Sequence, residues 1–147
     1  MIEVKTLTKR FDGFTALNNL TMTVPSGCVY GLVGPNGSGK STIIRHITGV
    51  YHPDSGEVLV GGEPVFEHPA VKARIACIPD DLSCHAGASI RELKSFYKGL
   101  YPAFSDERFT ALADIFKLDQ RQPLRRFSKG MQKQAAFWLA ICTQPDY

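Results

Sequence analysis

The chain has 147 residues, 44% of them hydrophobic and 21% charged, and a formal net charge of +3 at pH 7. These values are typical of one soluble globular domain, and so small a charge argues against nucleic acid as the main partner. The sequence shows no signal peptide and no apolar stretch of transmembrane length. We therefore expect a cytoplasmic protein that is not itself inserted in a membrane.

The first third of the chain is predicted to form β-strands joined by turns. Residues Ile2–Leu7 and Leu20–Val24 alternate between apolar and polar side chains, the pattern of half-buried strands. Cys28–Val33 is almost entirely apolar, which is typical of a strand buried on both faces. Val58–Val60 and Arg74–Ile78 are predicted as two further short strands.

Four helices are predicted from N-cap residues and from apolar residues that recur every three or four positions. The first helix runs from about Lys40 to Thr48, and Ser89, Ser105 and Ser128 each begin another, with Glu92 completing a capping box. The residues expected to face the core are, in chain order, Ile43, Ile44 and Ile47; Ile90, Leu93, Phe96, Tyr97 and Leu100; Phe109, Leu112, Ala113 and Phe116; and Met131, Ala135, Trp138, Leu139 and Cys142.

The four cysteines and four histidines show no spacing typical of a metal site. Cys28 and Cys142 lie within apolar runs, which predicts buried free thiols rather than disulfides. We assign no chemistry to the histidines.

A glycine-rich loop before the first predicted helix matches the Walker A pattern G-x-x-x-x-G-K-[ST]. Its glycines let backbone N–H groups wrap a phosphate, and the following helix adds its positive N-terminal end. Lys40 is expected to reach the β- and γ-phosphates, and the Ser41 hydroxyl to ligate Mg²⁺. The predicted phosphate-binding residues are Gly34, Pro35, Asn36, Gly37, Ser38, Gly39, Lys40, Ser41 and Thr42.

Motifs along the whole chain resemble the ATP-binding subunit of an ABC transporter. They are Lys9–Phe11, Ala16–Leu17, Gly31–Thr42, Pro53–Val58 and Phe127–Gln132. Other P-loop families have reason to share only the third of these. The resemblance implies an α/β fold, namely a P-loop NTPase core of ABC type with an N-terminal antiparallel β subdomain and a helical subdomain. It also implies ATP and Mg²⁺ as cofactors.

The resemblance assigns residues 1–81 to the β subdomain and P-loop core, 82–127 to the helical subdomain and 128–147 to the signature helix. It implies a membrane permease subunit as partner, so that the protein is peripheral to the membrane through the permease. The helical block, with exposed-side aromatics such as Tyr101 and Phe104, is where the family docks its permease. Two ATPase subunits, identical or different, are expected to hold ATP between them in the full-length form.

The resemblance assigns roles to residues outside the loop. Phe11 stands where the family places the aromatic that stacks on adenine, and Phe14 is the alternative stacker. The family signature L-S-G-G-Q is replaced by Phe127–Met131, in which Ser128 and Gly130 match while Lys129 and Met131 depart. These four residues, Ser128, Lys129, Gly130 and Met131, are expected to bind ATP held by the opposing subunit.

Asp80 replaces the glutamine that the family carries after a strand and a proline, and it is a candidate Mg²⁺ ligand beside Ser41. A rival interpretation takes Ile75–Ile78 with Asp80 and Asp81 as the Walker B strand of a compact P-loop NTPase. Pro79 argues against it, because proline interrupts the strand where its acid is needed.

The chain ends on Pro145, Asp146 and Tyr147, at the threshold of the strand that carries the Walker B acids in the family. We therefore expect a domain incomplete at its C-terminus, without catalytic Walker B acids or switch histidine, and with little hydrolysis by itself. The alternatives are a soluble ABC ATPase without a permease, and a nucleotide-binding remnant without activity. The transported substrate and its direction are not encoded here.

Overall fold

The computed structural model describes residues 1–80 and 87–147. Within them the chain divides into two compact units, Met1–Lys72 and Ala73–Tyr147. No helix in the described ranges is long and apolar enough to cross a membrane.

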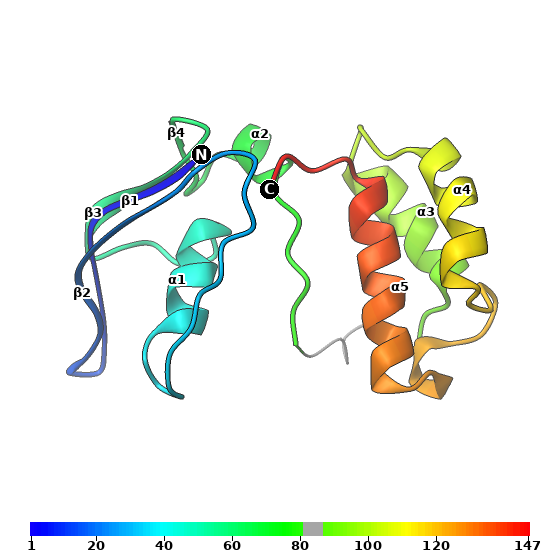
Figure 1. Ribbon diagram of the computed structural model, residues 1–147, viewed down its shortest axis with the longest axis horizontal. Helices are drawn as coiled ribbons and strands as arrows, with labels where there is room; N and C mark the ends of the chain where they lie inside the picture. Colours follow the sequence, from blue (N-terminus) through cyan, green and yellow to red (C-terminus); the bar gives the residue numbers. More distant parts are fainter. Residues whose placement is uncertain (81–86) are drawn as a thin grey trace. The chain divides into compact units, whose positions relative to one another are not determined.

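The first unit is built on an antiparallel sheet whose central strand is β1 (Figure 1). The strands are β1 (Ile2–Phe11), β2 (Phe14–Val24), β3 (Ser55–Val60) and β4 (Glu63–Pro64). They are hydrogen-bonded in the order β2-β1-β3-β4, and Ile2 pairs with both Val24 and Val60. The predicted strands Ile2–Leu7, Leu20–Val24 and Val58–Val60 are thus confirmed, each within a longer strand.

A β-bulge interrupts the alternation of β1. The register shifts after Val4 against β2 and after Lys5 against β3, and Thr6 has a φ of 47°. An extra residue in one strand moves the following side chains to the opposite face. For this reason Val4 and Leu7 are both buried although they are three residues apart.

Helix α1 (Lys40–Ile47) packs against β2 and β3, and a single helical turn, α2 (Pro69–Lys72), follows the sheet (Figure 1). Ile43 is buried as predicted, but Ile44 is exposed, so its expected inward position is wrong. His46 is buried instead. Helical residues three apart lie on the same side, and this places His46 with Ile43.

The predicted strand Cys28–Val33 is wrong: this segment is extended but belongs to no strand. Val29 and Val33 are almost fully exposed, and Cys28 is an exposed free thiol rather than a buried one. A strand needs a partner for its backbone hydrogen bonds, and within the described residues no ladder joins this segment to another. Apolar composition alone does not supply that partner.

The second unit is a helical bundle of α3 (Ile90–Leu100), α4 (Asp106–Phe116) and α5 (Lys129–Cys142), with a 3₁₀ turn, η2 (Leu124–Arg126), before α5 (Figure 1). All three predicted caps are confirmed. The hydroxyls of Ser89, Ser105 and Ser128 accept hydrogen bonds from backbone N–H groups three residues later.

The cap of α3 is the predicted capping box. The Glu92 carboxylate accepts hydrogen bonds from the Ser89 hydroxyl, at 2.7 Å, and from the Ser89 backbone N–H, at 2.8 Å. These two bonds hold the pKa of Glu92 below its usual value, because they stabilise the ionised form.

Trp138 of α5 is at the centre of the second unit's core. Its ring stacks on Phe109 at 4.4 Å and on Phe116 at 5.7 Å, and its indole N–H donates to the Phe109 carbonyl. The described core is Ile90, Leu93, Phe109, Leu124, Phe127, Ala135, Trp138, Leu139 and Cys142. Every core position predicted in α4 and α5 lies in or against this cluster.

Three expectations for this unit are wrong. Phe96 and Leu100 of α3 are more than half exposed, although they were expected to face the core. Phe104 packs against the core cluster, so it is not an exposed aromatic. The face that α3 buries is therefore narrower than its apolar spacing indicates: it includes Ile90 and Leu93 but neither Phe96 nor Leu100.

The segment Arg74–Ile78 forms no strand, contrary to the prediction, yet it does make backbone hydrogen bonds with the last residues. The N–H of Ala76 donates to the carbonyl of Tyr147 at 2.9 Å, and the N–H of Tyr147 donates to the carbonyl of Arg74 at 3.2 Å. These bonds have the slanted pattern of a parallel ladder. An ion pair of 2.6 Å between Arg74 and Asp146 accompanies them.

Replacing Gly56 with alanine should destabilise the first unit. Gly56 has a φ of +81°, and an added Cβ would lie 2.5 Å from the Thr6 carbonyl oxygen and nearer still to that of Lys5. We expect a loss of roughly 2–4 kcal/mol in the free energy of unfolding, measured by urea titration with far-UV circular dichroism. Gly62→Ala is the matched control, since Gly62 has a φ of +86° but nothing within 4 Å. Equal losses in the two variants would contradict the close approach.

Cys142 should resist alkylation while Cys28 and Cys77 react. Cys142 is buried, and burial raises the pKa of its thiol to about 11, whereas Cys28 and Cys77 are exposed. At pH 8 only about one Cys142 in a thousand is then thiolate, the reactive form. Iodoacetamide treatment followed by peptide mass spectrometry measures this, with protein in urea as the control in which Cys142 reacts. Labelling of native Cys142 at the rate of Cys28 would show that its burial is wrong.

Candidate functional site

The predicted phosphate-binding loop runs directly into α1 and is docked against β2. Gly37 and Gly39 have φ angles of +83° and +89°. A Cβ at Gly39 would lie 2.8 Å from the Ala16 carbonyl oxygen and 2.9 Å from Leu17 Cδ2. Only glycine meets both the positive φ and the close approach, so the Walker A glycine here is required by the packing of the loop.

Lys40 lies at the start of α1 and folds back over the loop. Its ammonium donates hydrogen bonds to the carbonyl oxygens of Gly34 and Pro35, both at 2.7 Å. The loop therefore curls around a positive charge. Ser41, the next residue, is exposed on the first turn of the helix.

The loop fits a bound phosphate group. The N-cap residue of α1 is Gly39, which has no side chain to satisfy the first N–H groups of the helix. At Gly34, an added Cβ would lie 2.7 Å from Ser38 Oγ, so a larger residue would fill the turn. A helix N-terminus without a side-chain cap and an ammonium are both groups that favour an anion.

The two candidate stacking residues, Phe11 and Phe14, lie at the two ends of the β1–β2 turn. Phe11 pairs with Phe14, and the turn residues Asp12 and Gly13 have φ angles of 43° and 83°, as in a type I′ hairpin. Phe14 is 63% exposed and Phe11 38% exposed. Phe11 has further contacts: the Tyr51 ring lies edge-on at 5.5 Å, and the Lys9 ammonium lies over the Phe11 ring at 5.5 Å.

Asp54 joins the turn before β3 to the end of β1, next to Phe11. Its carboxylate accepts hydrogen bonds from the Lys9 ammonium at 2.8 Å and from the Arg10 backbone N–H at 2.6 Å. These two bonds, the one from Lys9 first, lower the pKa of Asp54. Sequence reasoning took Pro53–Val58 only as a family turn and missed this contact. The available signal was an acid in that turn together with Lys9 in a second motif.

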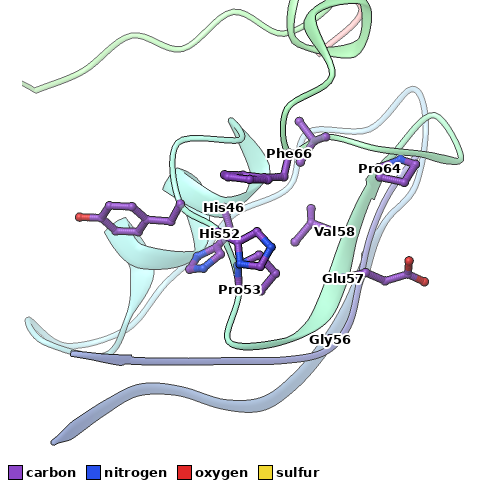
Figure 2. A pocket seen from close by; sticks show the side chains of 10 residues that line it. His46, His52, Pro53, Gly56, Glu57, Val58, Pro64 and Phe66 are labelled. Carbon is purple, nitrogen blue, oxygen red and sulfur yellow. The ribbon is translucent and has the colours of Figure 1, made fainter. Parts of the chain in front are cut away.

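A hollow of about 170 Å³ lies in the first unit beside these residues (Figure 2). Its lining includes His46, His52, Val58, Pro64 and Phe66, and none of the predicted phosphate-binding residues. The His52 and Phe66 rings meet edge-on at 4.6 Å. Residues of the Tyr51–Gly56 turn thus form part of the wall of this hollow.

His46 joins this hollow to α1. Its Nδ1 lies 2.8 Å from the Thr42 carbonyl oxygen, which can only accept, so Nδ1 carries the proton. Burial lowers the pKa of the imidazole, and it is therefore neutral at pH 7.

The predicted signature residues lie at the N-terminus of α5. Ser128 accepts a hydrogen bond from the Met131 N–H at 3.2 Å, and Ser128, Lys129 and Gly130 are exposed while Met131 is half-buried. Gln132 was not predicted as a site residue. Its side-chain amide donates to the carbonyl oxygens of Leu124 and Phe127, at 3.0 and 3.2 Å, and so fixes η2 against the helix.

Asp80 belongs to the second unit, whereas Lys40 and Ser41 belong to the first. Its exposed carboxylate lies 3.3 Å from the Lys133 ammonium of α5, and Lys133 also donates to the Pro79 carbonyl. Such an exposed ion pair contributes little to stability. Among the described residues no group of three acidic, histidine or cysteine side chains could hold a metal ion. Asp81, the second acid of the rival interpretation, lies outside the described residues.

Comparison with known proteins gives the family. The model described as "ABC transporter" matches residues 17–147. The chain is 30% identical over 145 residues to the ABC transporter ATP-binding protein YtrB of Bacillus subtilis, covering 99% of the chain and 50% of YtrB. It is 34% identical over 151 residues to the daunorubicin/doxorubicin resistance ATP-binding protein DrrA of Streptomyces peucetius, covering 99% of the chain and 46% of DrrA. The chain thus spans about half the length of the curated relatives it matches.

Solved structures of ABC transporter ATP-binding proteins have a similar fold. An ATP-binding subunit of an ABC transporter, 26% identical, superposes with a TM-score of 0.86 over 98% of this chain and 62% of its own. The cbiO1 protein of Clostridium perfringens, part of the ABC transporter complex cbiONQ, is 22% identical and has a TM-score of 0.79, with the same coverage of 98% and 62%. It supports the fold alone. With a family model matching most of its length, and with the Walker A loop in place before α1, the chain belongs to the ABC transporter family as an ATP-binding protein.

Proposed function

We propose that the 147 residues bind Mg·ATP through the Gly34–Thr42 loop, as part of an ATPase subunit that energises transport. The observation that supports this most directly is the loop itself. It curls around the Lys40 ammonium, and only glycine fits where it docks at Gly39. A triphosphate would replace the Gly34 and Pro35 carbonyls as the partner of that ammonium.

The other residues of the first unit have separate roles in this proposal. The N–H groups of the loop and of α1 bind phosphate oxygens, and the Ser41 hydroxyl holds Mg²⁺, which neutralises phosphate charge when bound. Phe11 stacks on the adenine. It is favoured over Phe14 because Tyr51 and Lys9 hold its ring, whereas Phe14 is largely exposed.

The second unit supplies the signature to a neighbouring subunit in a dimer. Ser128, Lys129 and Gly130 are exposed at the N-terminus of α5, whose first N–H groups favour an anion. Met131 is half-buried against the core, so it takes no direct part. Lys129 adds a positive charge where the family pattern has glycine.

The same 147 residues are proposed to bind ATP without turning it over by themselves. Asp146, which follows α5, is paired with Arg74. Asp80 is paired with Lys133. Loss of a general base alone costs a factor of about 10² to 10⁴ in rate.

The transport role is inferred from the family. Its relatives include a sulfate/thiosulfate import ATP-binding protein and a Nod factor export ATP-binding protein, so neither substrate nor direction carries over to this chain. In the second unit Phe96, Leu100 and Ile115 are exposed. We propose that such apolar side chains of the helical block contact a membrane permease subunit.

Lys40→Ala should abolish nucleotide binding. The substitution removes the charge at the centre of the loop, and we expect ATP affinity to fall at least about 100-fold, measured by isothermal titration calorimetry with Mg²⁺. Lys5→Ala is the matched control, because it removes an exposed lysine from the same unit without touching the loop. Unchanged affinity in Lys40→Ala would refute the proposed site. Steady hydrolysis by the wild-type chain that Asp80→Asn removes would instead favour the compact NTPase.

A further inference from the structure

The turn Tyr51–Ser55 is tied to the end of β1 by four hydrogen bonds, two of which the Asp54 carboxylate accepts. Asp54 accepts from the Arg10 backbone N–H and from the Lys9 ammonium, and Lys9 donates a second hydrogen bond to the His52 carbonyl at 3.0 Å. The backbone N–H of Asp54 in turn donates to the Thr8 carbonyl at 3.0 Å. Four hydrogen bonds thus converge on the three residues that precede Phe11 in β1.

Two side chains that contact Phe11, those of Tyr51 and Lys9, are held by this turn or by the same carboxylate. Tyr51, the first residue of the turn, meets the Phe11 ring edge-on, and its hydroxyl accepts from Arg45 at 2.9 Å. Lys9 lies over the Phe11 ring while its ammonium is bound to Asp54. Phe11 is otherwise at the tip of a hairpin, where a side chain has little to fix its rotamer.

We propose that Asp54 is a positioning residue for the nucleotide base, acting through Phe11. The carboxylate fixes the backbone at Arg10 and keeps the Lys9 ammonium over the ring, so that Phe11 is presented to a flat base in one orientation. The proposal rests on the proposed function, in which Phe11 stacks on adenine. According to this proposal, the Asp54 turn strengthens binding of the adenine base and has no effect on binding of the phosphates.

The difference between a base-bearing and a base-free ligand tests this. We expect Asp54→Ala to weaken Mg·ATP binding about fivefold, because it removes two hydrogen bonds that order the ring. Binding of magnesium tripolyphosphate, which has the phosphates but no base, should change less than about twofold. Both affinities are measured on the full 147-residue chain by isothermal titration calorimetry. A purely structural role would weaken both ligands together.

Three further variants sharpen the test. Asp54→Asn keeps an acceptor for the Arg10 N–H but removes the negative charge that binds the Lys9 ammonium. Its ATP affinity should therefore lie between those of wild type and Asp54→Ala. Glu57→Ala is the control, since it removes an exposed acid of β3 that pairs with Lys5 and not with the Phe11 region. In a Phe11→Ala background, Asp54→Ala should have no additional effect on ATP, because its effect passes through the ring.

The outcomes separate the two proposals. If Lys40→Ala binds ATP with the affinity of the wild type, the proposed phosphate site is overturned. With that site intact, the positioning role of Asp54 alone is overturned by any of three results. These are an unchanged ATP affinity in Asp54→Ala, an equal weakening of ATP and tripolyphosphate, or an undiminished Asp54 effect in the absence of the Phe11 ring.

Discussion

Close backbone approach at two glycines is the constraint on which the first unit depends. At Gly56 the start of β3 lies against the carbonyls of Lys5 and Thr6, and at Gly39 the Gly34–Thr42 loop lies against Ala16 and Leu17 of β2. No residue with a Cβ could occupy either position without moving backbone. The contact at Gly56 brings β3 against β1, while the contact at Gly39 holds the loop against β2 and so places α1 beside the sheet.

The second unit depends on side-chain packing instead. Trp138 stacks on two aromatic rings of α4, and its indole N–H donates to a backbone carbonyl. A serine N-cap begins each of the three helices. Gln132 then fixes η2 to α5 through two carbonyls. Because these contacts are internal to the bundle, they fix α5 in place without covering its N-terminus. Ser128, Lys129 and Gly130 there are exposed, and a helix N-terminus favours an anion.

The sequence predicted best where the deciding interactions are local. A serine N-cap, a capping box and apolar residues at helical spacing act within a few residues, and all three helices of the second unit begin where expected. The exposure of Phe96, Leu100 and Ile44 was not predictable in this way. Spacing shows that residues share a face, but it does not show how much of that face a neighbour covers.

Strands were harder to predict from the sequence than helices, because a strand forms only when another strand accepts and donates its backbone hydrogen bonds. Alternation gave β1 and β2 although it did not reveal the bulge at Thr6, which depends on how β1 registers with both neighbours. Cys28–Val33 has an apolar composition typical of a buried strand, yet the described residues provide no ladder for it. The pairing of Arg74–Ala76 with Tyr147 joins segments about half the chain apart, which no local pattern can predict.

By itself, then, the amino-acid sequence determined the chemistry: a glycine loop, a lysine and a serine in the order that binds phosphate, and helix caps that act on their own neighbours. Only the tertiary structure decided which groups cooperate at a distance. It joined Asp54 to Lys9 and Arg10 beside Phe11, paired Asp80 with Lys133, and buried His46 rather than Ile44. The physical reason is that a motif specifies what a side chain can bind, whereas its partner is set by backbone segments that approach one another only on folding.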